Sequence, residues 1–301
     1  MKKYVLKIAS FFLGFCLVLV LVCLPFQPLR KLGNQYIDIV HKTQNIACEK
    51  EDSIDTLILG DSIAWAGISP LRIYAKDKIT TYNGATSGQR LMDSIAVLER
   101  TLRHQNLKTV VLETNCIFTE FNSMQYSLEK LLPIFRYHDY YLKDFEKGGA
   151  VDDWKGYNYT TSTYPLEKTD YMVQTNEEMS DVNQTLLEQL YTMCTEKGIS
   201  LVLMTLPCPS SWNGTKHDLT QAWADAHGVP FLDMNTDAMP DMDFSTDFRD
   251  YGEHLNDSGA AKCSYALGDY IKENYSVREI QNIDYEKAIK AIEVYGTDGL
   301  Q

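Results

Sequence analysis

The chain has 301 residues, of which 45% are hydrophobic and 23% charged, so its composition is that of a globular protein and excludes a disordered one. The formal net charge is −13, and the first 29 residues contain three lysines and no acid, so residues 30–301 carry −16. A domain this acidic repels phosphate backbones, which excludes nucleic acid as its partner.

The N-terminus contains a long apolar run. Residues 8–26 carry no charge, and Lys2, Lys3 and Lys7 precede them. As a helix, the run would be about 28 Å long, which is close to the hydrocarbon thickness of a bilayer. No A-x-A-like cleavage site follows it. We therefore expect residues 1–29 to be a retained single-span anchor, with a cleaved signal peptide as the alternative.

The distribution of basic residues predicts the orientation of this span. More positive charge precedes it than follows it, so the positive-inside rule favours a cytoplasmic N-terminus. The remaining domain would then lie on the extracytoplasmic side of the cell membrane.

Seven cysteines are present, and they show neither a C-x-x-C pair nor a His/Cys ligand spacing. This pattern disfavours zinc, and we expect no metal. The sequence leaves open the disulfide state of the five cysteines outside the span, which are Cys48, Cys116, Cys194, Cys208 and Cys263.

Beyond a connecting helix expected within residues 30–53, apolar strand patterns alternate with helical ones. Strands are predicted at 55–59, 80–83, 108–112, 199–205 and 229–232, and helices at 89–104, 184–197, 219–227 and 258–274. This alternation predicts an α/β domain over residues 54–275, a three-layer sandwich around a parallel sheet. The tail, residues 276–301, has one helical pattern at 285–294.

Residues 116–175 interrupt this rhythm and are rich in aromatic side chains. The segment is too long for a plain loop. We expect an insertion that lies over the C-terminal edge of the sheet, where open α/β folds bind ligands. A local hydrophobic subdomain is the other interpretation.

Two segments far apart in the sequence carry the parts of a nucleophilic hydrolase. Ser62 follows a strand and the turn residues Gly60 and Asp61, and His254 has carboxylates on both sides. A serine needs a base to act as a nucleophile, and the base needs an acid to orient it. We expect Ser62, His254 and Asp250 to fill these roles. Two other acids, Glu253 and Asp247, are alternatives to Asp250.

Two further segments could stabilise an oxyanion. The small-residue loop Asn83–Gln89 follows the second strand, and Asn115 follows the third. Backbone N–H groups and side-chain amides are the usual donors in such sites. The expected donors are the N–H groups of Gly84 or Ala85 and the side chain of Asn115, together with the N–H group of Ser62.

These four blocks, in this order, resemble the SGNH (GDSL-type) hydrolase superfamily. Ala85 stands where that family's second block has glycine, Glu113 where the third has glycine, and Tyr251 where the last has aspartate. The resemblance implies a flavodoxin-like parallel sheet and a Ser-His-Asp mechanism without a cofactor. It extends over about residues 54–275.

Three stretches resemble a membrane-anchored branch of bacterial envelope proteins: Tyr82–Gln89, Leu132–His138 and Asp250–Asn256. That branch is thought to work with membrane-bound O-acyltransferases. The resemblance implies a serine esterase or O-acyl (acetyl) transferase acting on cell-envelope glycans, with an O-acyltransferase as partner. Arg136 and His138 are candidate substrate contacts. The alternative is a catalytically silent glycan-binding or scaffold subunit of an envelope acylation assembly.

Overall fold

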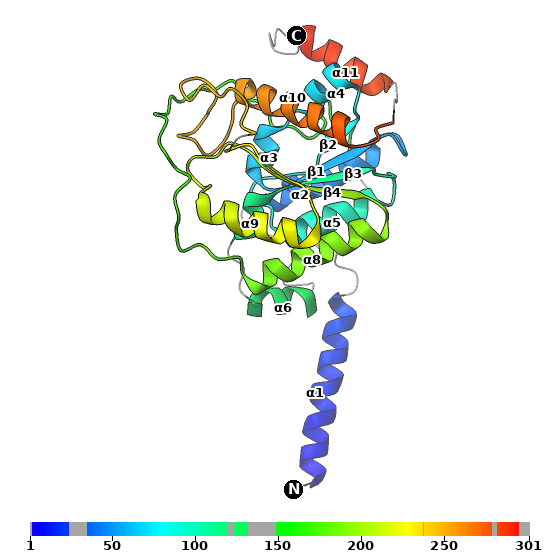
Figure 1. The fold of residues 1–301 in the computed structure, drawn as a ribbon. Coiled ribbons are helices and arrows are strands. Elements are labelled where there is room, and N and C mark those ends of the chain that lie inside the picture. Colours follow the sequence, from blue (N-terminus) through cyan, green and yellow to red (C-terminus); the bar gives the residue numbers. More distant parts are fainter. Residues whose placement is uncertain are drawn as a thin grey trace.

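The computed structural model describes residues 2–23, 35–119, 123–131, 149–236, 238–278 and 282–294. Within them lies one parallel sheet of five strands in the order β2-β1-β3-β4-β5 (Figure 1). The strands are β1 (Thr56–Leu59), β2 (Thr81–Asn83), β3 (Thr109–Glu113), β4 (Ser200–Thr205) and β5 (Phe231–Asp233). This order is that of flavodoxin-like folds, so the predicted fold class is confirmed.

The central strands are apolar in their middle positions because both faces of the sheet are covered. Every residue of β1, β2 and β3 is buried. Side chains alternate between the faces: Leu57 and Leu59 of β1 join one hydrophobic cluster, and Ile58 joins the other. The register pairs Leu57 with Val110 of β3, so apolar side chains on neighbouring strands share a face.

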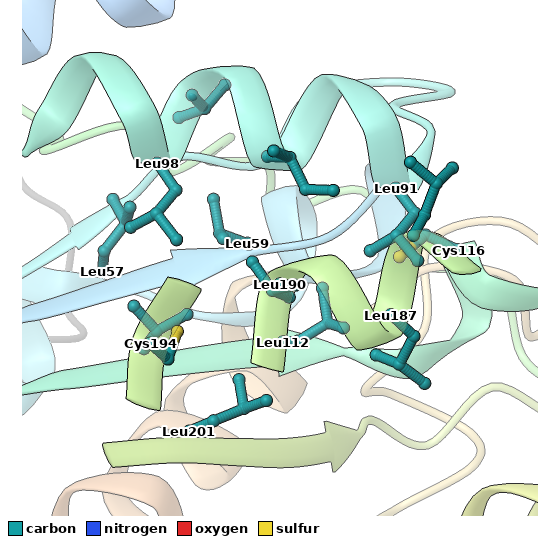
Figure 2. Close-up of a cluster of buried hydrophobic side chains, with 14 of the residues drawn as sticks. Leu57, Leu59, Leu91, Leu98, Leu112, Cys116, Leu187, Leu190, Cys194 and Leu201 are labelled. Carbon is teal, nitrogen blue, oxygen red and sulfur yellow. The ribbon is translucent and has the colours of Figure 1, made fainter. Parts of the chain in front are cut away.

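Helices α2 (Gln35–Cys48), α5 (Leu91–Thr101) and α8 (Asp181–Glu196) contribute to the first cluster. Figure 2 shows leucines of α5 and α8 packed against those of the strands. Helices α3 (Ser62–Gly67), α4 (Pro70–Asp77) and α10 (Asp257–Asn274) build the second cluster on the opposite face. Helix α9 (Gly214–His227) packs beside β5 (Figure 1).

Helix α4 has no counterpart among the predicted elements. It begins with Pro70 at its first position and ends at Lys78, which adopts a left-handed conformation. Its eight residues are too few for a helical period to stand out, and six of them are buried, so the usual polar face is missing. The tail helix expected at 285–294 is present as α11 (Ile283–Val294), and Tyr285 hydrogen-bonds the carbonyl of Thr81.

The described part of the insertion contains one helix, α6 (Ser123–Leu131), and a long irregular segment from residue 149 to the start of α8. This segment hydrogen-bonds to the last residue of β2 and to α3, the helix that follows β1. The N–H of Asn83 donates to the Lys155 carbonyl at 2.9 Å, and that of Asn158 donates to the Trp65 carbonyl at 2.9 Å. The segment therefore runs along the C-terminal edge of the sheet.

Helix α1 (Lys2–Cys23) is the apolar N-terminal element. The most apolar window of 18 residues in this helix has a mean hydropathy of 2.7, and none of it is buried inside the protein. The length and composition of this helix suit a membrane span or a signal sequence.

Candidate active site

Ser62 is held at the junction of β1 and α3. Gly60 has a φ of +149°, and a Cβ there would meet the Cβ of Glu113 at 2.7 Å, so only glycine fits this turn. Asp61 then caps α3, because its Oδ1 accepts the N–H of Ile63 at 2.9 Å. Ser62 is the first helical residue, and its own N–H has no acceptor within the helix.

His254 lies against Ser62. The distance between its Nε2 and the Ser62 Oγ is 2.7 Å, and the distance between its Nδ1 and the Asp250 Oδ2 is 2.6 Å. The three side chains form a continuous hydrogen-bonded chain. With Asp250 on one ring nitrogen, the tautomer that carries its proton on Nδ1 leaves Nε2 free to accept the serine proton.

In the last block of the family that the sequence resembles, aspartate precedes histidine by three residues. The turn that carries His254 explains why this chain departs from that spacing. Asp250 precedes His254 by four residues, and its Oδ1 also accepts the His254 backbone N–H at 2.7 Å. The intervening residues Tyr251 and Gly252 have φ values of +54° and +92°. Two successive left-handed residues absorb the extra position, so the carboxylate still reaches the imidazole.

The two alternative acids are placed differently. Asp247 is buried and accepts hydrogen bonds from Lys262 and Ser258, both at 2.7 Å. Glu253 is exposed, and its N–H bonds the carbonyl of Asp250. The carboxylate hydrogen-bonded to the imidazole is that of Asp250.

Asn115 lies next to the nucleophile. Its Nδ2 donates to Asp61 Oδ2 at 3.3 Å, and its Oδ1 lies 3.4 Å from Lys216 Nζ. These contacts orient the amide with its NH₂ group toward the residue that precedes Ser62. One N–H of that group remains for a ligand. Lys216 is nearly buried, so it places a positive charge behind the amide.

The structure corrects the expectation for Gly84 and Ala85. The Gly84 N–H donates to the Ile58 carbonyl at 2.8 Å, and the Ala85 N–H donates to Asn83 Oδ1 at 3.1 Å. Both residues are buried. Neither amide is free to meet an oxyanion, because the loop uses both to join itself to β1 and to its own first residue. The loop reaches the surface at Ser87, which is partly exposed, and at Gly88, which is exposed.

Two carboxyl groups are buried beneath Ser62. Burial is the largest effect on both, and it raises the pKa of Asp61 and raises that of Glu113 well above its usual value. The negative charge of Asp61 adds to the rise at Glu113. The N–H of Ile63 and the amide of Asn115 partly oppose it at Asp61. Glu113 Oε1 accepts the Asn115 N–H at 3.2 Å, whereas its Oε2 has no partner.

A cluster of Asp250, Glu253 and His254 has ligand atoms within 4.8 Å of one another. It is poorly suited to a metal ion, because both ring nitrogens of His254 are engaged by Ser62 and Asp250. A metal would have to break one of these bonds. The donor set instead suits proton transfer.

Sequence reasoning missed Lys216 and a second histidine–carboxylate pair. His217 Nδ1 lies 2.6 Å from Asp233 Oδ2, and Asp233 also accepts the Trp212 Nε1–H at 3.1 Å. His217 belongs to α9, Trp212 precedes that helix, and Asp233 ends β5, so no short motif joins them. Arg136 and His138, the candidate substrate contacts, lie outside the described residues.

No protein-family model matches the sequence, and no curated protein is similar to it. Similar solved structures include a lipase/acylhydrolase from Enterococcus faecalis, with 14% identity over 75% of this chain and 100% of the other, and a TM-score of 0.42. A GDSL-like lipase from Bacteroides thetaiotaomicron has 12% identity over 78% and 98% of the two chains and a TM-score of 0.41.

A psychrotrophic esterase from Pseudoalteromonas sp. has 15% identity over 73% and 97% of the two chains and a TM-score of 0.41. These three proteins are described as a lipase/acylhydrolase, a GDSL-like lipase and an esterase. At such low identity the likeness concerns the fold, so the case for function is made from the site itself.

Proposed function

We propose that the chain is a serine ester hydrolase. The observation that carries this proposal is the hydrogen-bonded chain from Ser62 through His254 to Asp250, with distances of 2.7 and 2.6 Å. An imidazole within reach of both a hydroxyl and a carboxylate is the arrangement that general-base activation of serine requires.

The proposed reaction has two halves. Ser62 Oγ attacks the ester carbonyl while its proton moves to His254 Nε2, and Asp250 stabilises the resulting imidazolium. The tetrahedral intermediate then expels the alcohol, which takes that proton from His254. Water repeats the sequence on the acyl-serine, so that a carboxylic acid leaves and Ser62 regains its proton.

The oxyanion needs donors close to Ser62. We propose the N–H of Ser62, which is the first of α3, and the free Nδ2–H of Asn115, whose amide lies beside the α3 cap Asp61. A further donor would come from the exposed part of the second loop, Ser87 and Gly88, in place of Gly84 and Ala85.

We further propose that the enzyme acts on acyl, in particular acetyl, esters of cell-envelope glycans and is anchored by α1 on the extracytoplasmic side. The apolar, unburied α1 supports the anchor, and the sequence resemblance supports the substrate and an O-acyltransferase partner. If a sugar hydroxyl replaced water in the second half-reaction, the same residues would perform acyl transfer.

The test uses the full chain in detergent with 4-nitrophenyl acetate and a fluorophosphonate probe. We expect the wild type to label and turn over the ester, and Ser62→Ala to abolish labelling and lower kcat by about 10³-fold or more. Ser127→Ala, an exposed serine on α6, is the matched control. A wild type that neither labels nor hydrolyses the ester would favour the silent scaffold instead.

A further inference from the structure

A polar cavity of about 590 Å³ opens beside the N-terminus of α10. Its wall combines Arg72 of α4, the first two turns of α10 and the segment 159–163 of the insertion. This volume lies within the range of about 300–1,000 Å³ that is typical of ligand pockets. None of the residues assigned above to Ser62 chemistry lines it.

The charged groups of this wall already have partners. Arg72 Nη2 lies 2.5 Å from Asp257 Oδ2, and the Tyr157 hydroxyl donates to the other oxygen of Asp257 at 3.2 Å. Lys262 is paired with Asp247 at 2.7 Å. Because each cation has a carboxylate partner, the pocket offers no net charge to an ion and favours a neutral, polar ligand.

Arg72 retains unused hydrogen-bonding capacity. The residue is only 4% exposed, and its Nε has no partner. Its Nη1 lies 3.5 Å from the Tyr265 hydroxyl, which is longer than a good hydrogen bond. The Nε atom is itself enclosed by protein, so the donor of this guanidinium that a bound oxygen atom would satisfy is Nη1, beside Tyr265 in the cavity wall.

The other side of the wall provides an aromatic ring and hydroxyl groups. The Tyr159 ring stacks on Trp154 with the centroids 4.6 Å apart and an interplanar angle of 16°, which holds the ring in place. Thr161 adds a hydroxyl to this wall, and Thr163 and Ser258 add hydroxyl oxygens that can accept, because their protons are donated to the Thr161 carbonyl and to Asp247. Sugar rings present C–H faces to aromatic rings and hydroxyls to such groups.

We propose that this cavity binds a carbohydrate and is a subsite for the glycan chain whose ester is attacked at Ser62. The two sites are connected through the same two segments of the chain. Asp257 follows His254 by three residues, and its N–H donates to Thr160 at 2.8 Å. The same insertion bonds Trp65 of α3 through Asn158 at 2.9 Å. The inference rests on the proposed esterase, because it assigns the polymer that carries the ester.

The test measures binding and turnover separately. The Ser62→Ala chain, in a detergent without a sugar headgroup, is titrated calorimetrically with hexaoses of N-acetylglucosamine, xylose, glucose and mannose. We expect at least one of them to bind, and Tyr159→Ala or Thr161→Val in that background to weaken binding by about tenfold. Tyr270→Ala on α10 and Thr195→Val on α8 are the matched controls and leave it unchanged.

With Ser62 restored, the same pocket variants should raise KM for the O-acetylated form of the bound hexaose by more than they raise KM for 4-nitrophenyl acetate. The inference is overturned if none of the four sugars binds, if the pocket variants bind as well as the controls, or if inorganic phosphate displaces the sugar from the pocket. A wild type that neither hydrolyses 4-nitrophenyl acetate nor reacts with the fluorophosphonate would refute the esterase instead. Failure of the sugar subsite and failure of the esterase are therefore distinguishable.

Discussion

At the scale of single residues, the buried carboxyl of Glu113 sets a pH dependence of stability. Burial and the charge of Asp61 raise its pKa well above the usual value. The folded chain therefore holds this proton more tightly than the unfolded chain. Between the unfolded-state pKa and the higher folded-state pKa, the free energy of unfolding falls as pH rises. Below the unfolded-state pKa, both states hold the proton, so the carboxyl causes no loss of stability.

We therefore predict that Glu113→Gln, which keeps an oxygen for the Asn115 N–H, raises the free energy of unfolding at pH 8 relative to wild type. Each unit between the folded and unfolded pKa values corresponds to about 1.4 kcal/mol. Urea unfolding from pH 4 to pH 8 would measure the gain, which should shrink toward pH 4. A gain that is independent of pH, or equal to that of exposed Glu178→Gln, would contradict the mechanism.

The residues of the site differ in how far the sequence could predict them. Ser62 and His254 were identifiable because a strand-end serine and an acid-flanked histidine are local patterns. The contact of Asp250 with the His254 imidazole depends on the left-handed conformations of Tyr251 and Gly252. The spacing of residues in the sequence does not predict these conformations. The error at Gly84 and Ala85 has a similar cause, because a small-residue loop does not reveal which of its N–H groups the fold uses.

At the scale of elements, a buried ion pair joins the insertion to Glu49, the residue that follows α2. Lys155 Nζ lies 2.9 and 3.0 Å from the carboxylate oxygens of Glu49, and both residues are buried. The carbonyl oxygen of Lys155 also accepts a hydrogen bond from the backbone N–H of Asn83, at the end of β2. The pair thus connects the residue after α2 with the edge strand and with the loop that follows it.

Removing only one partner would leave an uncompensated buried charge, so we predict that Lys155→Met lowers the free energy of unfolding by about 3–5 kcal/mol. The double substitution Glu49→Leu with Lys155→Met removes both charges and should be less destabilising than Lys155→Met alone. Urea midpoints of the wild type and of the single and double variants would test this. Effects that simply add would show that the pair is not coupled.

The elements that the sequence predicted share a property. The strands and the longer helices, such as α5, α8 and α10, show a full apolar period and were found within a few residues of their observed ends. The short helix α4 shows no such apolar period. Its position is known only from the structure, where it packs against α10. It carries Arg72, so the cavity that it helps to form could not be predicted either.

At the scale of the whole molecule, the position of the domain relative to the membrane follows from α1 and remains a prediction. Basic residues before the apolar run favour a cytoplasmic N-terminus. The domain that follows carries −16, so its charge opposes contact with an anionic membrane surface. The active site would then face envelope material and not the lipid.

One cysteine can report this topology directly. Cys48 at the end of α2 is exposed, whereas the four other cysteines of the domain are buried, namely Cys116, Cys194, Cys208 and Cys263. Cys16 lies within the apolar helix, where lipid would shield it. In a full-length Cys23→Ser variant, we expect a membrane-impermeant maleimide to label intact spheroplasts, and the added Cys48→Ser substitution to abolish labelling. Labelling that needs prior lysis would place the domain in the cytoplasm, away from envelope glycans. Soluble, labelled domain lacking residues 1–29 would instead identify α1 as a signal peptide.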